Sequence, residues 1–241
     1  MMKKMNLTII CLLLAGLCGC GNEPLEYTNG DLKVSVEQGE GWIHDFPLFL
    51  GITKKNPPQI AIWIEDIEGN YLSTVYVTHK TATQSWQSAG GNRRKESLPH
   101  WCHKRGVVYE DGLYLPTKEH PLTDGITGAT PKSGFDIKLK PSASLKQFVV
   151  KVEINHSRDF NDFYPKSAKV GENNYSGGKD GSGQPAVVYS ANVDLSSGKK
   201  SFEALPAGHS SPDGSTGKLY EDISGLTSAL HIVKRIIITI Q

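Results

Sequence analysis

Residues 59–78, QIAIWIEDIEGNYLSTVYVT, decide the fold class of this chain. Within residues 59–66, the isoleucines at alternate positions share one face of an extended strand, while an alanine and a tryptophan lie on the other. Because both faces are apolar, we expect a central strand covered on both sides. A turn at residues 68–70 follows, and residues 71–78 alternate again, so the stretch predicts a β-hairpin.

The same two-residue period recurs along the chain, and a helical turn is expected only within residues 81–89. Further strands are predicted at Asp31–Glu37, Phe135–Lys140, Gln147–Asn155, Pro185–Leu195 and Ile232–Ile240. About seven strands, with 13 prolines and 25 glycines for the turns, indicate an all-β, antiparallel β-sandwich with long decorated loops. The last strand contains three consecutive isoleucines, so we expect it to lie inside the sheet, because an exposed edge of this kind would aggregate.

The N-terminal residues are typical of a bacterial lipoprotein signal peptide, assigned to residues 1–19. Lys3 and Lys4 precede an apolar run that is about half the ~20 residues of a membrane-spanning helix. The run ends in the lipobox Leu17-Cys18-Gly19-Cys20, so Cys20 is the predicted lipidation site. The residues after Cys20 contain no aspartate at the second position, which favours an outer-membrane lipoprotein facing the periplasm, with cell-surface display as the alternative.

Removal of the signal peptide leaves a near-neutral protein. It takes away two lysines and no acidic residue, so the formal net charge falls from +1 to −1. A protein without a net basic surface is not expected to bind nucleic acid. Residues 20–30 are polar and predict a tether, and residues 31–241 predict one β-sandwich domain, with a division into two near residues 171–183 as the alternative.

Several segments together carry a resemblance to a known family. They are PQIAIWIEDIEGNYLSTVYVT, LPHWCHKRG, DGITGAT with PKSG, and FVVKVEINHSRDFNDFYP, and the likeness that they carry spans about residues 31–165. In these segments the chain resembles domain of unknown function family 2271, a family of predicted periplasmic proteins. The resemblance implies an immunoglobulin-like sandwich. Members are often found beside flavin transferases and membrane electron-transfer proteins, so it also implies a redox setting.

Residues 124–130, DGITGAT, match the pattern D-x-x-[ST]-G-A-[TS]. The pattern is similar to the acceptor motif of periplasmic flavin transferases, which attach FMN through its phosphate to the final threonine. The likeness makes Thr130 the candidate attachment site for covalent FMN, with Asp124, Thr127, Gly128 and Ala129 completing the motif. A hydroxyl can form a phosphoester, and small neighbours let the backbone enter another enzyme's cleft. The alternative is a glycine-containing turn whose threonines bond the local backbone.

A basic stretch between residues 93 and 105 contains Arg93, Arg94 and Arg105 around a tryptophan. Guanidinium groups bind phosphate or carboxylate, so the stretch predicts an anion or partner surface, with a solvated loop as the alternative. No G-x-S-x-G nucleophile elbow accompanies the serine, histidine and aspartate of residues 208–214, which argues against a hydrolase. The sequence therefore predicts a lipid-anchored, non-catalytic accessory of envelope electron transfer that carries FMN. The alternative is a cofactor-free binding or scaffold lipoprotein.

Overall fold

The computed structural model describes residues 31–47, 50, 52–86 and 93–241. The predicted signal peptide, Cys20 and the tether lie outside the described residues. The described strands are β1 (Leu32–Gln38), β2 (His44–Pro47), β3 (Thr53–Asn56), β4 (Gln59–Glu65), β5 (Tyr71–Thr78), β6 (Ile126–Gly128), β7 (Phe135–Leu139), β8 (Gln147–Asn155), β9 (Val187–Asp194), β10 (Ser201–His209) and β11 (Val233–Ile240). The helices are α1 (His79–Thr83), α2 (Pro99–Lys104), and the short 3-10 helices η1 (Gly178–Asp180) and η2 (Ser228–His231).

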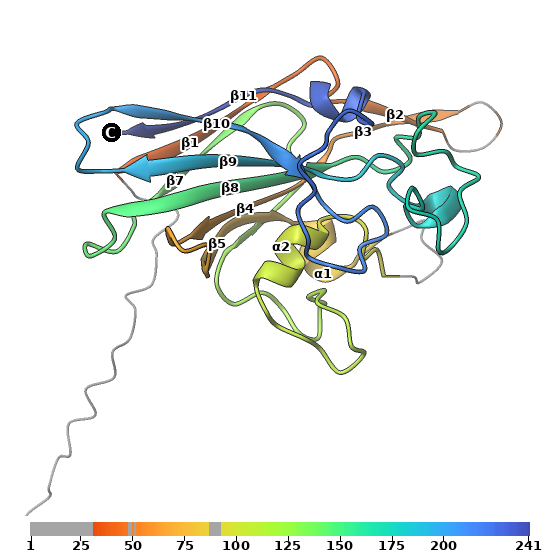
Figure 1. Cartoon of the computed structure of the whole chain (residues 1–241), viewed down its shortest axis with the longest axis horizontal. Helices are drawn as coiled ribbons and strands as arrows, with labels where there is room; N and C mark the ends of the chain where they lie inside the picture. The colour runs from red at the N-terminus through yellow and green to blue at the C-terminus, as the bar shows by residue number, and fades with distance from the viewer. Residues whose placement is uncertain (1–30, 48–49, 51, 87–92) are drawn as a thin grey trace, which may run out of the picture.

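Nine strands form one curled sheet in the order β6-β5-β4-β8-β9-β10-β11-β1-β7 (Figure 1). Neighbours pair antiparallel except for β5 and β6, which are parallel. The chain between β5 and β6 includes both α-helices, and a connection of that length permits parallel pairing. Strands β2 and β3 form a separate hairpin at one end of the molecule. The predicted all-β class is confirmed, and the sheet is mixed rather than wholly antiparallel.

Strand β10 is where the sheet changes direction. Its first half, Ser201–Ala204, pairs with β11, and its second half, from Leu205 to His209, pairs with β9. A bulge between Pro206 and Gly208 accompanies the change, and bulges bend strands. The two parts of the sheet therefore enclose one apolar core, an arrangement that resembles a sandwich. The immunoglobulin-like detail implied by the resemblance is not confirmed, because the strands form one continuous sheet.

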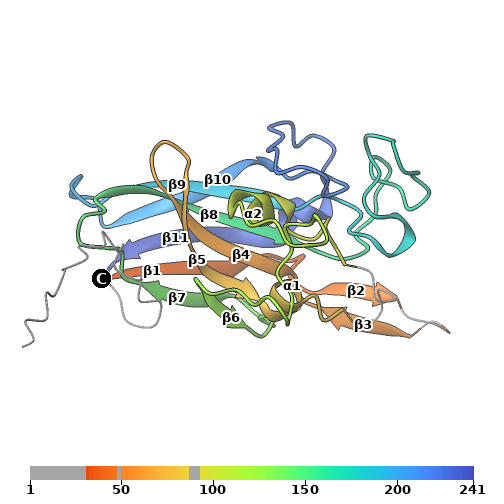
Figure 2. The same cartoon turned by 90° about the horizontal axis from the view of Figure 1, so that it is seen from below.

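The core confirms the prediction that β4 is covered on both faces. The isoleucines of β4 enter the main core together with residues of β1, β8, β9 and β11. Ala61 and Trp63 enter a second apolar layer on the outer face of the sheet, which α1, α2 and residues 113–115 cover. Helix α2 lies over β4 and β8 (Figure 2). This second layer fixes the position of α2 and of the polar groups around it.

Most predicted strands are found near the expected residues. All five strands predicted outside the 59–78 hairpin are present as β1, β7, β8, β9 and β11, and β11 lies inside the sheet between β10 and β1. The predicted helical turn within residues 81–89 is found earlier, as α1 at His79–Thr83, and residues 87–89 lie outside the described residues. Within the described part of the chain, no helix is both long and apolar enough to cross a membrane.

Candidate functional site

The candidate flavin-acceptor motif lies at one edge of the curled sheet. Its middle residues form β6, which pairs with β5 in the register Tyr76↔Ile126 to Thr78↔Gly128. Thr130 lies two residues beyond the end of β6, so its hydroxyl is outside the strand ladder, and the residue is half-buried. Thr127, the other threonine of the motif, is exposed. The motif therefore ends in a threonine that lies outside the strand ladder and is only partly buried.

The first residue of the motif is fixed to β5. The Tyr71 hydroxyl donates a hydrogen bond to the Asp124 carboxylate, and the Thr74 backbone N–H donates to Asp124 Oδ2 at 3.2 Å. Burial, reinforced by the bond to Asp124, raises the pKa of Tyr71, so this phenol stays protonated and remains a donor. Asp124 thus anchors the start of the motif to the neighbouring strand.

Both glycines of the motif lie against β5 side chains. A Cβ atom at Gly125 would approach Thr74 Cβ to 2.8 Å, and one at Gly128 would approach Tyr76 Cε2 to 2.5 Å. Only glycine allows β6 to lie this close to β5 without displacing the Tyr76 ring. The glycines of the motif therefore have a packing role as well as any role in modification.

The Gly128 contact gives a testable prediction for stability. We expect Gly128→Ala to lower the free energy of unfolding by about 1–3 kcal/mol, because overpacking displaces neighbouring side chains. Urea unfolding measures the change. In a Tyr76→Leu background the same substitution should cost less, because the clashing ring is gone. An equal cost in both backgrounds would show that the ring contact does not limit this position.

The backbone on each side of Thr130 is held by a buried aromatic side chain. The Tyr76 hydroxyl donates to Ala129 O at 2.9 Å, and Trp42 Nε1 donates to Pro131 O at 3.1 Å. Tyr76 and Trp42 both belong to the main core. The sequence pattern identified the motif but did not identify these two anchors, which lie 53 and 89 residues away along the chain from their partners.

The three arginines of the predicted anion surface have separate internal partners. Arg93 contacts the Asp111 carboxylate and the backbone oxygen of Leu115. The Arg105 guanidinium lies over the Trp101 ring, 5.2 Å from its centroid, and Nη2 is 3.4 Å from the Tyr109 hydroxyl. Part of the basic stretch is helical, since α2 begins at Pro99, a residue type suited to the first turn.

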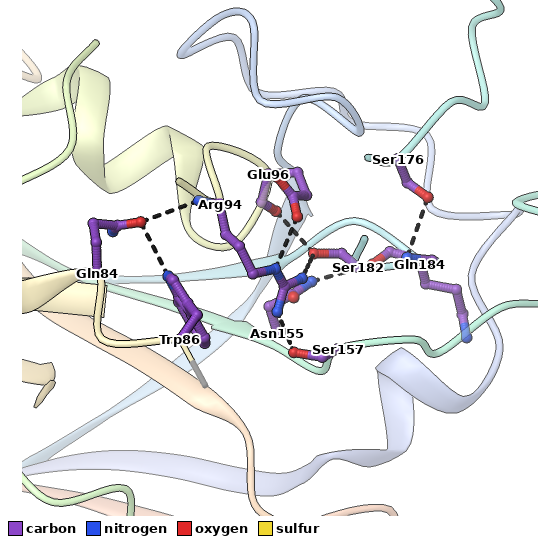
Figure 3. Close-up of polar contacts among 10 residues, drawn as sticks. Gln84, Trp86, Arg94, Glu96, Asn155, Ser157, Ser176, Ser182 and Gln184 are labelled. Carbon is purple, nitrogen blue, oxygen red and sulfur yellow. Dashed lines mark hydrogen bonds and ion pairs between the residues drawn. The ribbon is translucent and has the colours of Figure 1, made fainter. Parts of the chain in front are cut away.

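Arg94 is the most buried of the three and organises a polar network (Figure 3). Its Nε donates to Glu96 Oε1 at 2.9 Å, and its terminal nitrogens donate to the Ser157 and Ser182 hydroxyls. The guanidinium also lies over the Trp86 ring, 4.9 Å from the centroid. Arg94 thus joins the segment before α2 to the end of β8 and to the loop before β9. Its donors are engaged by the protein itself.

Glu153 on β8 holds the first turn of α2. Its two carboxylate oxygens accept the backbone N–H groups of His100 at 3.1 Å and Trp101 at 2.7 Å. The side chain is fully buried, and burial raises the pKa of Glu153 to about 8 although the two backbone bonds lower it. Trp101 Nε1 in turn donates to Thr74 Oγ1 at 3.0 Å. A continuous polar connection therefore runs from β8 through α2 to β5, the strand to which Asp124 of the motif is bonded.

The histidine of residues 208–214, His209, contacts the backbone and a neighbouring aromatic ring. His209 Nδ1 is 2.7 Å from the backbone oxygen of its neighbour Ser210, and its ring stacks on Tyr220 with centroids 5.3 Å apart. Among the described residues, no three histidine, cysteine, aspartate or glutamate side chains converge in a way that could hold a metal ion.

Comparison of the chain with family models, with curated proteins and with solved structures finds no match. The resemblance to domain of unknown function family 2271 therefore stays a prediction from the quoted segments. A function for the candidate site has to rest on the geometry of the site itself.

Proposed function

We propose that this protein is a lipid-anchored, non-catalytic accessory of electron transfer in the bacterial envelope, and that it carries FMN covalently on Thr130. The observation that supports the attachment site is the position of Thr130, half-buried and two residues beyond the end of the edge strand β6. Cys20 would carry the lipid and place the domain at the outer membrane, facing the periplasm. A flavin transferase and a membrane redox protein are the proposed partners.

The modification is a phosphoester transfer. Thr130 Oγ would form a bond to the phosphorus of FMN and lose its proton, while the bond from that phosphorus to the leaving group of the flavin donor breaks. The hydrogen bonds to Ala129 O and Pro131 O would keep the attachment point in a fixed place on the domain. The redox chemistry would then belong to the flavin, and the protein would position it.

A specific observation supports the cofactor-free alternative. Asp124, Gly125 and Gly128 each have a packing or hydrogen-bonding role against β5, so three of the motif's seven residues have a structural reason for their identity. In this alternative the motif is a tight edge segment, and the domain is a lipid-anchored binding or scaffold module.

One experiment separates the two proposals. The full chain is co-expressed with a flavin transferase, and the intact mass and visible absorbance of the purified protein are measured. We expect the wild type to gain one FMN phosphoester and the flavin absorbance, and Thr130→Ala to gain neither. Thr123→Ala is the matched control, since it removes an exposed threonine just before the motif and should retain the flavin.

An unmodified wild type would contradict the flavin proposal, provided that the same transferase preparation modifies a known acceptor protein. That result would support the cofactor-free binding module. Flavin retained by Thr130→Ala but lost by Thr127→Ala would move the attachment site to Thr127, the other threonine of the motif.

A further inference from the structure

A small pocket lies beside α2, on the outer face of the sheet. Its volume is about 180 Å³, and it opens between α2, residues 112–115 and the segment 214–215. None of its residues belongs to the flavin-acceptor motif, so a ligand of this pocket would bind whether or not Thr130 is modified. Pockets for drug-sized ligands are about 300–1,000 Å³, so this pocket is small and suits a compact molecule.

One part of the pocket is apolar and aromatic. Leu113 and Leu115 line it, and Leu115 belongs to the second apolar layer. The His103 and Tyr114 rings, both of which line the pocket, lie with their centroids 4.0 Å apart and their planes at 30°. Ligand pockets commonly combine such walls with a small number of placed polar groups. A ligand for this pocket must therefore have an apolar or aromatic body.

The charge of the lining is positive. Lys95 lines the pocket, and no carboxylate does so among the described residues. Asp213 lies close by along the chain, and its Oδ1 accepts the Ser211 and Ser215 hydroxyls at 2.8 and 2.7 Å. Burial opposes ionisation of Asp213, but the bonds from Ser215 and Ser211 and the nearby charge of Lys95 lower its pKa. The described side chains of Lys95 and Asp213 do not form a direct ion pair with each other, so the ammonium can still pair with a ligand. Burial lowers the pKa of His103, so at neutral pH the imidazole is a neutral wall and the ammonium of Lys95 provides the charge. A complementary ligand is an anion.

The segment 214–217, whose first two residues line the pocket, lies close to its neighbours. A Cβ atom at Gly214 would fall 2.2 Å from the backbone oxygen of Lys95, and one at Gly217 would fall 2.4 Å from His103 Cβ. Gly214 also has a positive φ of 68°, which favours glycine. These glycines allow the segment to close the pocket against Lys95 and His103. A preformed pocket reduces the ordering cost of binding.

From these observations we infer that the pocket binds a small monocarboxylate with an apolar or aromatic body, whose carboxylate pairs with Lys95 and whose body packs on Leu113, Leu115 and Tyr114. In this proposal the basic stretch at residues 93–105 contributes to an anion site through Lys95. Arg93, Arg94 and Arg105 instead contact internal partners.

The test uses 4-fluorobenzoate as the probe and the full chain in detergent, with binding followed by fluorine NMR of the probe. We expect saturable binding to the wild type. Ser215→Trp should abolish it, because Ser215 is an exposed residue that lines the pocket and a large ring there fills the opening. Lys95→Met should weaken it about tenfold or more through loss of a charge-assisted bond.

Four controls identify the ligand class. Lys199→Met removes an exposed lysine in the turn between β9 and β10 and should bind the probe as the wild type does. 4-Fluorobenzyl alcohol, which has the same body without the charge, and inorganic phosphate, which has charge without the body, should compete at least about tenfold less well than benzoate. Lys95→Arg, which keeps the charge, should retain most of the affinity if Lys95 acts as a cation.

Three results would overturn the inference. The first is absence of saturable binding by the wild type. The second is binding that neither Lys95→Met nor Ser215→Trp changes, since the probe would then bind elsewhere. The third is equal competition by one of the two partial ligands. Equal competition by the neutral alcohol would show that the carboxylate is not needed for binding, and equal competition by phosphate would show that the apolar body is not needed. Equal thermal unfolding midpoints for all variants would show that the fold is intact.

Discussion

Replacing Arg94 with methionine is expected to lower the free energy of unfolding by about 3–5 kcal/mol, the range for breaking a buried ion pair by removing one partner. The Arg94 and Glu96 side chains are only 7% and 8% exposed, and they meet at 2.9 Å. Methionine fills much of the same volume but leaves the Glu96 carboxylate buried without its cation. The Ser157 and Ser182 hydroxyls lose a partner as well. Urea unfolding followed by tryptophan fluorescence measures the change.

The matched control is Arg235→Met, which breaks another arginine–glutamate pair, with Glu37, on the protein surface. Exposed ion pairs contribute little, so we expect its unfolding midpoint to stay close to that of the wild type. Adding Glu96→Gln to Arg94→Met should recover part of the loss, because no unpaired buried charge remains. Equal effects of Arg94→Met and Arg235→Met would mean that burial of the network contributes nothing to its strength.

The strands that could be predicted from the sequence are those in which burial alone decides which positions are apolar. β4 is apolar at successive positions because both of its faces are covered, and its sequence shows this directly. β8 is predicted with the observed bounds, Gln147–Asn155, because buried apolar residues recur at every second position along it. In these strands the spacing of apolar residues along the sequence indicates which faces of the strand are buried in the folded protein.

The strands that were not predicted lack this periodicity. β10 contains Pro206 and Gly208, residues that usually end a strand, and they are accommodated here at the bulge where its pairing changes from β11 to β9. β3 is the polar segment TKKN, which pairs only with β2 and has little apolar surface to bury. Pairing with a partner strand creates these two elements, and the partner is not visible in the local sequence.

The candidate sites show the same limit. The sequence could identify Thr130 as a hydroxyl in a motif, but its anchors Tyr76 and Trp42 are distant residues whose contacts arise only in the folded sheet. The basic stretch predicted an anion surface, yet the positions of its residues in the sequence could not show which basic side chains would bond to other groups of the same protein. Arg94 meets serines from two other segments, and Lys95, its neighbour in the chain, lines a pocket instead.

The second large effect is expected in the pH dependence of stability, through Glu153. Its pKa in the folded protein is raised from 4.5 to about 8, chiefly by burial. Between these values the folded state binds a proton that the unfolded state has released. The contribution of Glu153 is therefore fully present below about pH 4.5 and is lost as the pH rises toward 8, at about 1.4 kcal/mol per pH unit.

Glu153→Gln isolates this effect, because glutamine has no proton to lose in this range, and its amide oxygen can still accept a backbone N–H from the first turn of α2. The measurement is the unfolding free energy of both proteins in urea, from about pH 5 to about pH 8. The wild-type value minus the variant value should fall steadily with rising pH.

Burial lowers the pKa of His156 to about 4, so below its unfolded value of 6.5 this histidine makes stability rise with pH. It does so in both proteins and cancels in the difference. A difference that stays flat would mean that the two backbone N–H bonds keep the carboxylate ionised throughout, and that α2 begins on a buried negative charge.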